Sequence, residues 1–274
     1  MTTIRAKQRG LSLISLLIAL TIGIFLLAGL FDLWLQTRNT FNAQGSLAQL
    51  QDNERVALTN MATIVQSGGF YPLADNYATL PPSPLLTPAN VFTVSNTAGK
   101  FATAGQYIYG TVGTSGATAN PSDTLYVRFM AGPASNALDC LGQSHADQTL
   151  ITNVYSVNST TAELDCQVTA VSPAGAVTVS NKQPIINPIT TGGGNTQSGV
   201  YQMLISYGVD PGNTGSVTQY MTAATVNSNA YWGSVRSLKI QLQFANPLAN
   251  QPGQPGTLNP ITRIVAVTQT TAGI

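Results

Sequence analysis

The stretch LSLISLLIALTIGIFLLAGL, residues 11–30, decides the fold of this chain. Its length of about 20 residues is what an α-helix needs to cross the hydrocarbon core of a bilayer. No charged residue lies between Arg9 and Asp32, and no proline interrupts the run. Because a charge in mid-membrane is costly and this run has none, we expect it to form a membrane-spanning helix.

The short leader before this stretch is basic. Its cations, Arg5, Lys7 and Arg9, hold the N-terminus on the cytoplasmic side, so the sequence after the helix is expected outside the cytoplasm. A cleaved secretory signal peptide has a similar start and is the alternative. It fits less well, because residues 28–30 (Ala-Gly-Leu) are a poor cleavage site and helix-compatible sequence continues to residue 66.

The helix is predicted to continue from Phe31 to Gln66 with an amphipathic pattern. One face of this half is expected to carry the positions that recur at steps of three and four: Leu47, Leu50, Glu54, Leu58, Met61 and Val65. We expect that face to pack on a globular domain. Gly68 and Gly69 follow and supply the left-handed cap position, so the helix should end there after about 55 residues, or about 80 Å.

Beyond Ser67 the composition shifts to Thr, Ser, Asn, Gly and Val, which is typical of short strands and turns. The segments predicted as strands are 125–130, two arms of a hairpin within 150–168, 176–180, a strand ending at 207–210, 237–244 and 261–270. Residues 71–120 are predicted to be irregular apart from one strand within 100–110, and residues 182–199 to be a glycine-rich loop. The predicted fold class is therefore α+β, with a long N-terminal helix and a globular head of antiparallel strands.

The two cysteines, Cys140 and Cys166, both lie in the part of the chain expected outside the cytoplasm. In an oxidising compartment such a pair most simply forms one disulfide, which here closes a loop of about 26 residues and contributes about 3 kcal/mol. Metal ligation and nucleophilic catalysis are the alternatives. Two thiols and the lone histidine, His145, do not complete a tetrahedral zinc site, and His145 is expected on the surface.

No other arrangement for catalysis is apparent. The sequence lacks a G-x-S-x-G elbow, a phosphate-binding loop and an H-E-x-x-H motif, so neither an enzyme nor a cofactor is predicted. Only 8% of residues are charged and the net charge is +1, so no direct binding of nucleic acid is predicted. Asp210 is a weak candidate for calcium, but a turn stabilised by this aspartate and Gly212 explains the same residues better, because calcium loops recruit several carboxylates.

The junction between the leader and the apolar stretch, R-G-L-S-L-I, resembles the type III signal of type IV prepilins. The resemblance implies that prepilin peptidase cuts between Gly10 and Leu11 and that Leu11 becomes the methylated N-terminus. Most pilins begin with phenylalanine and carry glutamate at the fifth mature position, where this sequence has Leu11 and Ser15.

Three further motifs resemble the PilW family of minor pilins. They are Q-x-x-x-R-x-A-L leading into a glycine and an aromatic (Gln51, Arg55, Ala57, Leu58, Gly69, Phe70), D-C-L-G at 139–142, and Y-G-V-D at 207–210 followed by Q-Y. The last strand lacks the Arg-Asn ending expected of the family. The resemblance implies a structural minor pilin, held in the bacterial inner membrane with its head outward before assembly and on the pilus or cell surface afterwards.

The partners implied by this resemblance are other minor pilins, the major pilin, prepilin peptidase and the assembly platform of the inner membrane. The expected organisation is a leader (1–10), a membrane and filament-core half-helix (11–31), an amphipathic half-helix (32–67) and the head (68–274). A type II secretion-like pseudopilin and a membrane-anchored extracytoplasmic binding or hydrolase domain are the alternatives.

Ser15 leads to a hypothesis about position in the filament. In pilins the glutamate at this place is thought to attract the N-terminal amine of a subunit already in the filament, and hydrocarbon strengthens that attraction. A subunit that enters first has no such amine to find, so it can lack the carboxylate. Either this chain initiates or caps the pilus at its tip, or serine is simply tolerated there in a low-copy subunit.

Overall fold

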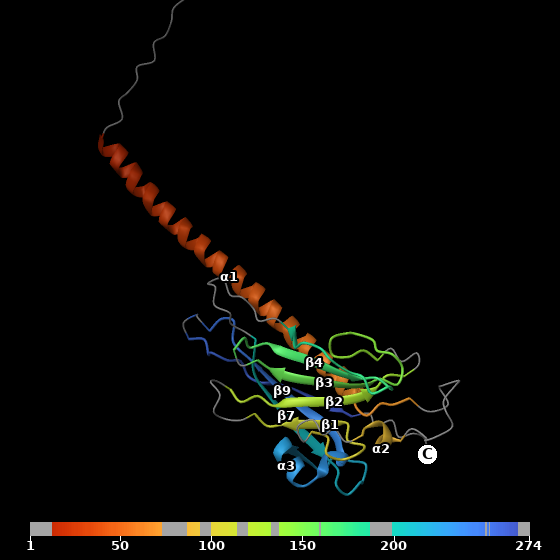
Figure 1. Ribbon diagram of the computed structural model, residues 1–274. Coiled ribbons are helices and arrows are strands. Elements are labelled where there is room, and N and C mark those ends of the chain that lie inside the picture. Colours follow the sequence, from red (N-terminus) through yellow and green to blue (C-terminus); the bar gives the residue numbers. More distant parts are fainter. Residues whose placement is uncertain are drawn as a thin grey trace, which may run out of the picture. The chain divides into compact units, whose positions relative to one another are not determined.

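The structure, a computed structural model, describes residues 13–72, 87–93, 100–113, 120–132, 137–158, 160–186, 199–249, 251 and 253–267. The chain divides into two compact units, residues 1–47 and 48–274. The first unit holds the N-terminal part of helix α1 (Leu13–Ser67), and the second holds its C-terminal part and every strand (Figure 1). The expected fold class is confirmed: a long helix is followed by a head of antiparallel strands.

Helix α1 is 55 residues long and ends at the predicted glycines. Gly69 has a φ of +80°, and its N–H donates to the carbonyl of Arg128 at 2.9 Å. A Cβ at Gly69 would lie 3.1 Å from the Tyr107 ring. Glycine is therefore favoured here both by the left-handed backbone and by the close aromatic ring.

The part of α1 within the second unit buries one face against the head. Its buried residues are Leu50, Ala57, Met61, Ala62, Ile64 and Val65. The expected stripe was right for Leu50, Met61 and Val65 but wrong for Leu47, which is 37% exposed. The buried face includes two alanines, whose small side chains let the sheets lie close to the helix. The predicted stripe missed both alanines because it was drawn from the spacing of large apolar residues.

The first sheet has the strand order β1-β2-β3-β4-β5, with β6 also paired to β4, and all its pairs are antiparallel. Its strands are β1 (Ile108–Thr111), β2 (Thr124–Met130), β3 (Leu150–Val157), β4 (Leu164–Val171), β5 (Val177–Val179) and β6 (Gln183–Ile186). The predicted hairpin is confirmed, and Asn158 Oδ1 accepts hydrogen bonds from the N–H groups of Thr160 (3.0 Å) and Thr161 (3.3 Å) to form its turn.

The second sheet has the order β10-β9-β7-β8 and is also antiparallel. Its strands are β7 (Val200–Val209), β8 (Gln219–Thr222), β9 (Val235–Phe244) and β10 (Ile261–Ala266). The alternation predicted for β9 is confirmed, because Leu238, Ile240 and Leu242 are fully buried while the residues between them are half-buried. One hydrophobic core joins the inner faces of both sheets to the second half of α1.

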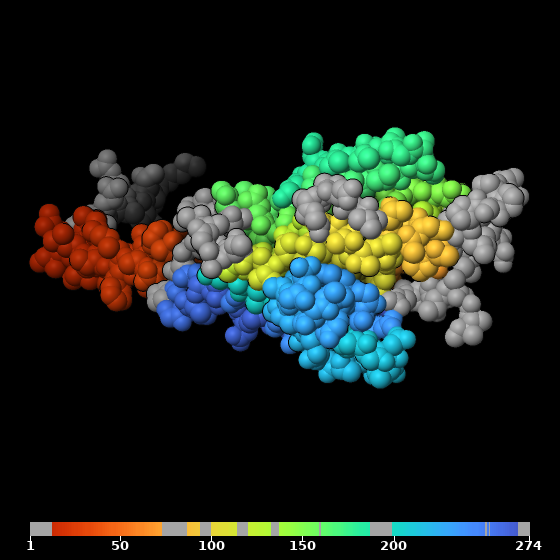
Figure 2. All heavy atoms as spheres, turned by 60° about the horizontal axis from the view of Figure 1, so that its bottom comes forward, coloured from red at the N-terminus to blue at the C-terminus, as the bar shows by residue number. Residues whose placement is uncertain are grey.

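Several short elements were not predicted, among them two helices and strand β6. Helix α2 (Pro88–Val91) begins with a capping box, in which the Thr87 side chain accepts from the N–H of Asn90. Helix α3 (Ala223–Ser228) follows β8 directly and contacts β1 and β7. In Figure 2 the blue segment that contains α3 lies beside the yellow segment that contains β1. The prediction of a loop from residue 182 was wrong at its start, since β6 pairs with β4 there, and residues 187–198 of that loop lie outside the described residues.

Candidate functional sites on the helix and the head

The first candidate site is the apolar part of α1. Every large apolar side chain between Leu13 and Leu35 is exposed, with Phe25 at 82%. An apolar surface of this extent around a helix is covered either by lipid or by the helices of other subunits. In the described part of the chain, α1 is the one helix long and apolar enough to cross a membrane.

Ser15 lies in the first turns of α1 and is exposed, whereas Gly10 and Leu11 lie outside the described residues. Hydroxyl groups further along the helix bond back to their own backbone. The Thr21 hydroxyl donates to the carbonyl of Ile18 at 2.9 Å. Such a bond satisfies a hydroxyl inside hydrocarbon without any second helix.

The second candidate site is the joint that fixes α1 to the head. Asn60 on α1 donates through Nδ2 to the Cys140 carbonyl at 3.1 Å, and its Oδ1 accepts from the Tyr155 hydroxyl at 2.6 Å. The Cys140 N–H in turn donates to Oδ1 of Asn153 at 2.8 Å. We call Asn60, Tyr155, Cys140 and Asn153 the helix–head joint.

The cysteines belong to this joint. The structure pairs Cys140 with Cys166, with Cα atoms 6.3 Å apart, and Cys166 lies opposite Tyr155 in the ladder of β3 and β4. Burial, with a smaller contribution from the negative charge of Asp139, raises the pKa of Tyr155 well above its usual value. The Tyr155 hydroxyl therefore stays protonated and remains a donor to Asn60.

The loop after β2 is held by Asp139. Its Oδ1 accepts from the N–H groups of Leu141 (2.8 Å) and Gln143 (2.9 Å), and its Oδ2 lies 2.8 Å from Nε2 of His145. The expectation that His145 lies on the surface was wrong, because its side chain is only 17% exposed. Asp139 and His145 therefore shape the segment that carries Cys140.

Asp210 organises the turn after β7. Its Oδ1 accepts from the N–H of Thr214 at 2.9 Å and its Oδ2 from the N–H of Gly215 at 2.8 Å. These hydrogen bonds, the bond to Thr214 first, lower the pKa of Asp210. Among the described residues no group of three or more His, Cys, Asp or Glu gathers to hold a metal. The carboxylate thus has the geometry of a turn-forming aspartate.

Sequence reasoning missed Asn60 and Asp123 as structural polar residues. Asp123, which precedes β2, accepts from the N–H of Ile205 at 2.7 Å and from the N–H of Gly113 at 3.1 Å, so it ties the first sheet to β7 of the second. Burial raises the pKa of Asp123, and these two bonds partly oppose that effect. Neither residue belongs to a recognisable motif, and only long-range contacts reveal their roles.

The chain thus combines one exposed apolar helix, long and apolar enough to cross a membrane, with a head of antiparallel strands. Residues 154–260 match the family model of the type IV pilus-assembly protein W, PilW, which confirms the resemblance seen in the sequence. This part of the chain, 107 of its 274 residues, is therefore similar to a protein of type IV pilus assembly.

Among solved structures, a type IV-like pilin from Thermus thermophilus is similar to this chain. It is 12% identical, with a TM-score of 0.38, and the similarity covers 80% of this chain and 96% of that chain. A sequence comparison with curated proteins gives no match.

Proposed function

We propose that this chain is a minor pilin that prepilin peptidase processes after Gly10 and that helps to initiate or cap a type IV pilus. The observation that carries the proposal is the division of α1. Its N-terminal part exposes apolar side chains throughout, while residues 48–67 are built into the core of the head. The N-terminal part can therefore contact either lipid or the apolar helices of a filament core. Residues 48–67 instead attach the helix to the head.

In this mechanism the residue 11–31 half of the helix stores the subunit in the inner membrane, with the head of residues 68–274 outside. On assembly the helix leaves the bilayer and packs against the helices of other pilins. The loss of lipid contact is offset by burial against those helices, because both surroundings are apolar. The directed step is therefore driven by the assembly machinery, and this chain supplies the surfaces.

Ser15 supports a place at or near the tip. The hydroxyl of serine bonds to a carbonyl one turn back in its own helix, so it enters hydrocarbon at low cost and needs no amine from a neighbouring subunit. A first subunit is recruited by contacts of its head and meets no earlier N-terminal amine, so it does not need a carboxylate at this position. The proposal includes the other minor pilins as the partners of the head and the major pilin as the subunit added next.

The test is made in cells that build pili. Deleting the gene should sharply reduce surface pili while the amount of major pilin in the membrane stays constant, and the wild-type chain should restore them. Unchanged piliation after deletion would contradict the initiating role.

The position of the subunit is tested by Ser15→Glu, with Ser15→Gln as the neutral control of similar size. A tip subunit should gain little from the carboxylate, or begin to appear along the shaft when the filaments are labelled with gold. If Ser15→Glu alone strongly raises incorporation at the normal location, the tip position is wrong.

A further inference from the structure

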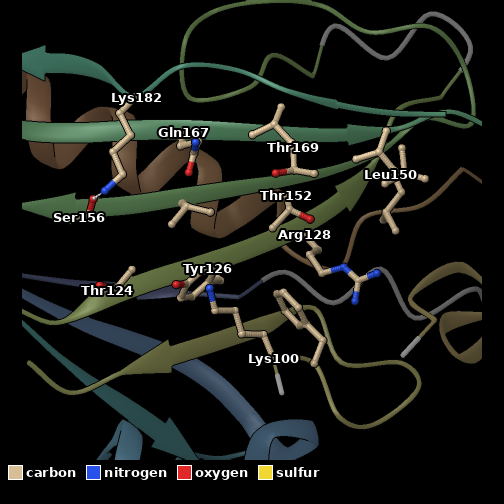
Figure 3. Close-up of a pocket in the computed structure, with 15 residues that line it drawn as sticks. Lys100, Thr124, Tyr126, Arg128, Leu150, Thr152, Ser156, Gln167, Thr169 and Lys182 are labelled. Atoms are coloured by element: carbon tan, nitrogen blue, oxygen red, sulfur yellow. Dashed lines mark hydrogen bonds between the residues drawn. The ribbon is translucent and has the colours of Figure 1, made fainter. Parts of the chain in front are cut away.

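A groove of about 630 Å³ crosses the outer face of the first sheet, on the side away from the core (Figure 3). Side chains from β2, β3, β4 and β5 form its floor, and Lys100 and Phe101 form a wall before β1. Its volume lies within the range of about 300–1,000 Å³ that small-molecule sites occupy. The groove lies entirely within the unit that contains the head.

Three cations line this groove, namely Lys100, Arg128 and Lys182, and no acidic residue is among the lining residues. None of the three has a carboxylate within ion-pair distance in the described part of the chain, whereas Arg55 pairs with Asp52 at 2.8 Å. Asp165, which is itself buried, is close enough to feel the charge of Lys182 but does not line the groove.

Arg128 is the unusual member of this set, because it is only 3% exposed and yet pairs with no carboxylate among the residues that the structure describes. Its Nη1 donates to the Thr93 carbonyl at 3.1 Å, and its guanidinium lies 4.5 Å from the centre of the Phe101 ring. Burial lowers the pKa of Arg128 to about 10. A buried cation without a counter-charge is costly, so an anion that reached this guanidinium would be bound tightly.

The rest of the lining is neutral and mixes polar side chains with apolar ones, among them Leu150, Val154 and Val171. Hydroxyl and amide groups lie in rows across neighbouring strands, contributed by Thr124, Thr152, Ser156, Gln167 and Thr169. The ammonium group of Lys182 lies 3.3 Å from the Ser156 hydroxyl, well separated from Arg128 in Figure 3. This pattern of spaced charges among many donors and acceptors matches a chain that carries occasional anions and many hydroxyls.

The aromatic residues argue against a nucleic acid. Single strands bind by stacking bases on open aromatic faces along a continuous basic track. Here Lys100 lies 4.4 Å from the centre of the Tyr126 ring, and Arg128 covers Phe101, so a cation already occupies a face of each ring. Three cations also fall short of the one charge per nucleotide that a longer phosphate backbone presents.

We propose that this groove binds a short segment of an acidic polysaccharide. Sugar carboxylates pair with Arg128 and with one or both lysines, and sugar hydroxyls bond to the rows of threonine, serine and glutamine. The site is independent of the role in assembly, because it uses neither α1 nor the helix–head joint. It gives the head of a pilus subunit a means to hold an anionic glycan matrix or capsule.

The test measures binding of tetragalacturonate to the full-length protein in neutral detergent by isothermal titration calorimetry. We expect binding that weakens as salt is raised, and no binding of maltotetraose, a neutral glucan of the same length. Lys182→Gln should weaken binding about fivefold and Arg128→Gln about tenfold or more, as the loss of a charge-assisted hydrogen bond implies.

The matched control is Lys239→Gln, which removes a half-buried lysine from β9 of the other sheet and should leave binding unchanged. Because Arg128→Gln removes a buried side chain, the exposed Lys182 decides the result if the arginine variant does not fold. The proposal is overturned if tetragalacturonate does not bind, if maltotetraose binds equally, or if Lys182→Gln and Lys239→Gln behave alike. Tighter binding of a twelve-residue oligothymidylate would overturn it in favour of a nucleic acid.

Discussion

The helix–head joint yields a prediction whose size follows from its geometry. Asn60→Ala removes the acceptor of the Tyr155 hydroxyl and the donor to the Cys140 carbonyl. Tyr155 is fully buried, so its hydroxyl is left without an acceptor from the protein. An orphaned buried group costs about 1–3 kcal/mol, and we expect Asn60→Ala to destabilise the head by about 2 kcal/mol.

Tyr155→Phe breaks the same hydrogen bond at a lower cost. It leaves Oδ1 of Asn60 unbonded, but Asn60 is only half-buried and that oxygen can be hydrated. The expected loss is about 1 kcal/mol. In the double variant no hydroxyl remains to be orphaned, so the two losses should fall short of additivity by about 1 kcal/mol.

Thermal unfolding of the full-length protein in detergent, followed by near-ultraviolet circular dichroism, measures these effects. For a domain of this size 1 kcal/mol shifts Tm by about 2–4 °C, so Asn60→Ala should lower Tm by about 4–8 °C. The control is Gln51→Ala on the exposed face of the same helix, which should change stability by less than about 0.5 kcal/mol. Equal effects of Asn60→Ala and Gln51→Ala, or strict additivity of the double variant, would refute the reasoning.

Two further predictions concern the head. Gly110→Ala would place a Cβ against the buried Tyr207 hydroxyl and 2.8 Å from Cζ of that ring. We expect this variant to lower the free energy of unfolding by about 1–3 kcal/mol, measured by thermal unfolding. The control is Gly233→Ala, whose Cβ meets nothing within 4 Å and which should leave stability unchanged. Folding lowers the pKa of Asp210, so its carboxylate stabilises the folded state at pH values above its unfolded pKa. This stabilisation is lost as the pH falls through the pKa of the folded state. The hydrogen-exchange protection of the Gly215 amide, which bonds to Asp210, should therefore drop in acid below about pH 4 and become independent of pH in Asp210→Asn; a constant protection in the wild type would contradict this.

The sequence predicted the elements whose periodicity is strong. The helix expected from the uncharged run of residues 11–30 and the alternation of β9 each follow from one dominant pattern, and the structure shows the helix from Leu13 onward and the strand. The elements missed are short or lie in proline- and glycine-rich sequence. Strand β6 contains Pro184 and forms because β4 offers it an edge, which is a tertiary cause that no local pattern carries.

The functional residues divide in the same way. The pairing of the two cysteines could be predicted from the sequence, whereas Asn60 and Arg128 gain their roles from residues 80 or 35 positions away, respectively. A polar residue on a helix face or an arginine in a strand has ordinary explanations until its burial and its partners are known. The prediction of a strand at 125–130 was right, but the sequence could not show that Arg128 within it is buried.

The central claim is that this chain is a prepilin that becomes a pilus subunit. Intact-mass measurement of the protein extracted from membranes of cells that contain prepilin peptidase tests it most directly. The account predicts a mass that begins at Leu11 with one added methyl group, and the full chain from Met1 in cells that lack the peptidase. A mass that retains residues 1–10 in the presence of the peptidase, or one that begins after residues 28–30, would contradict it.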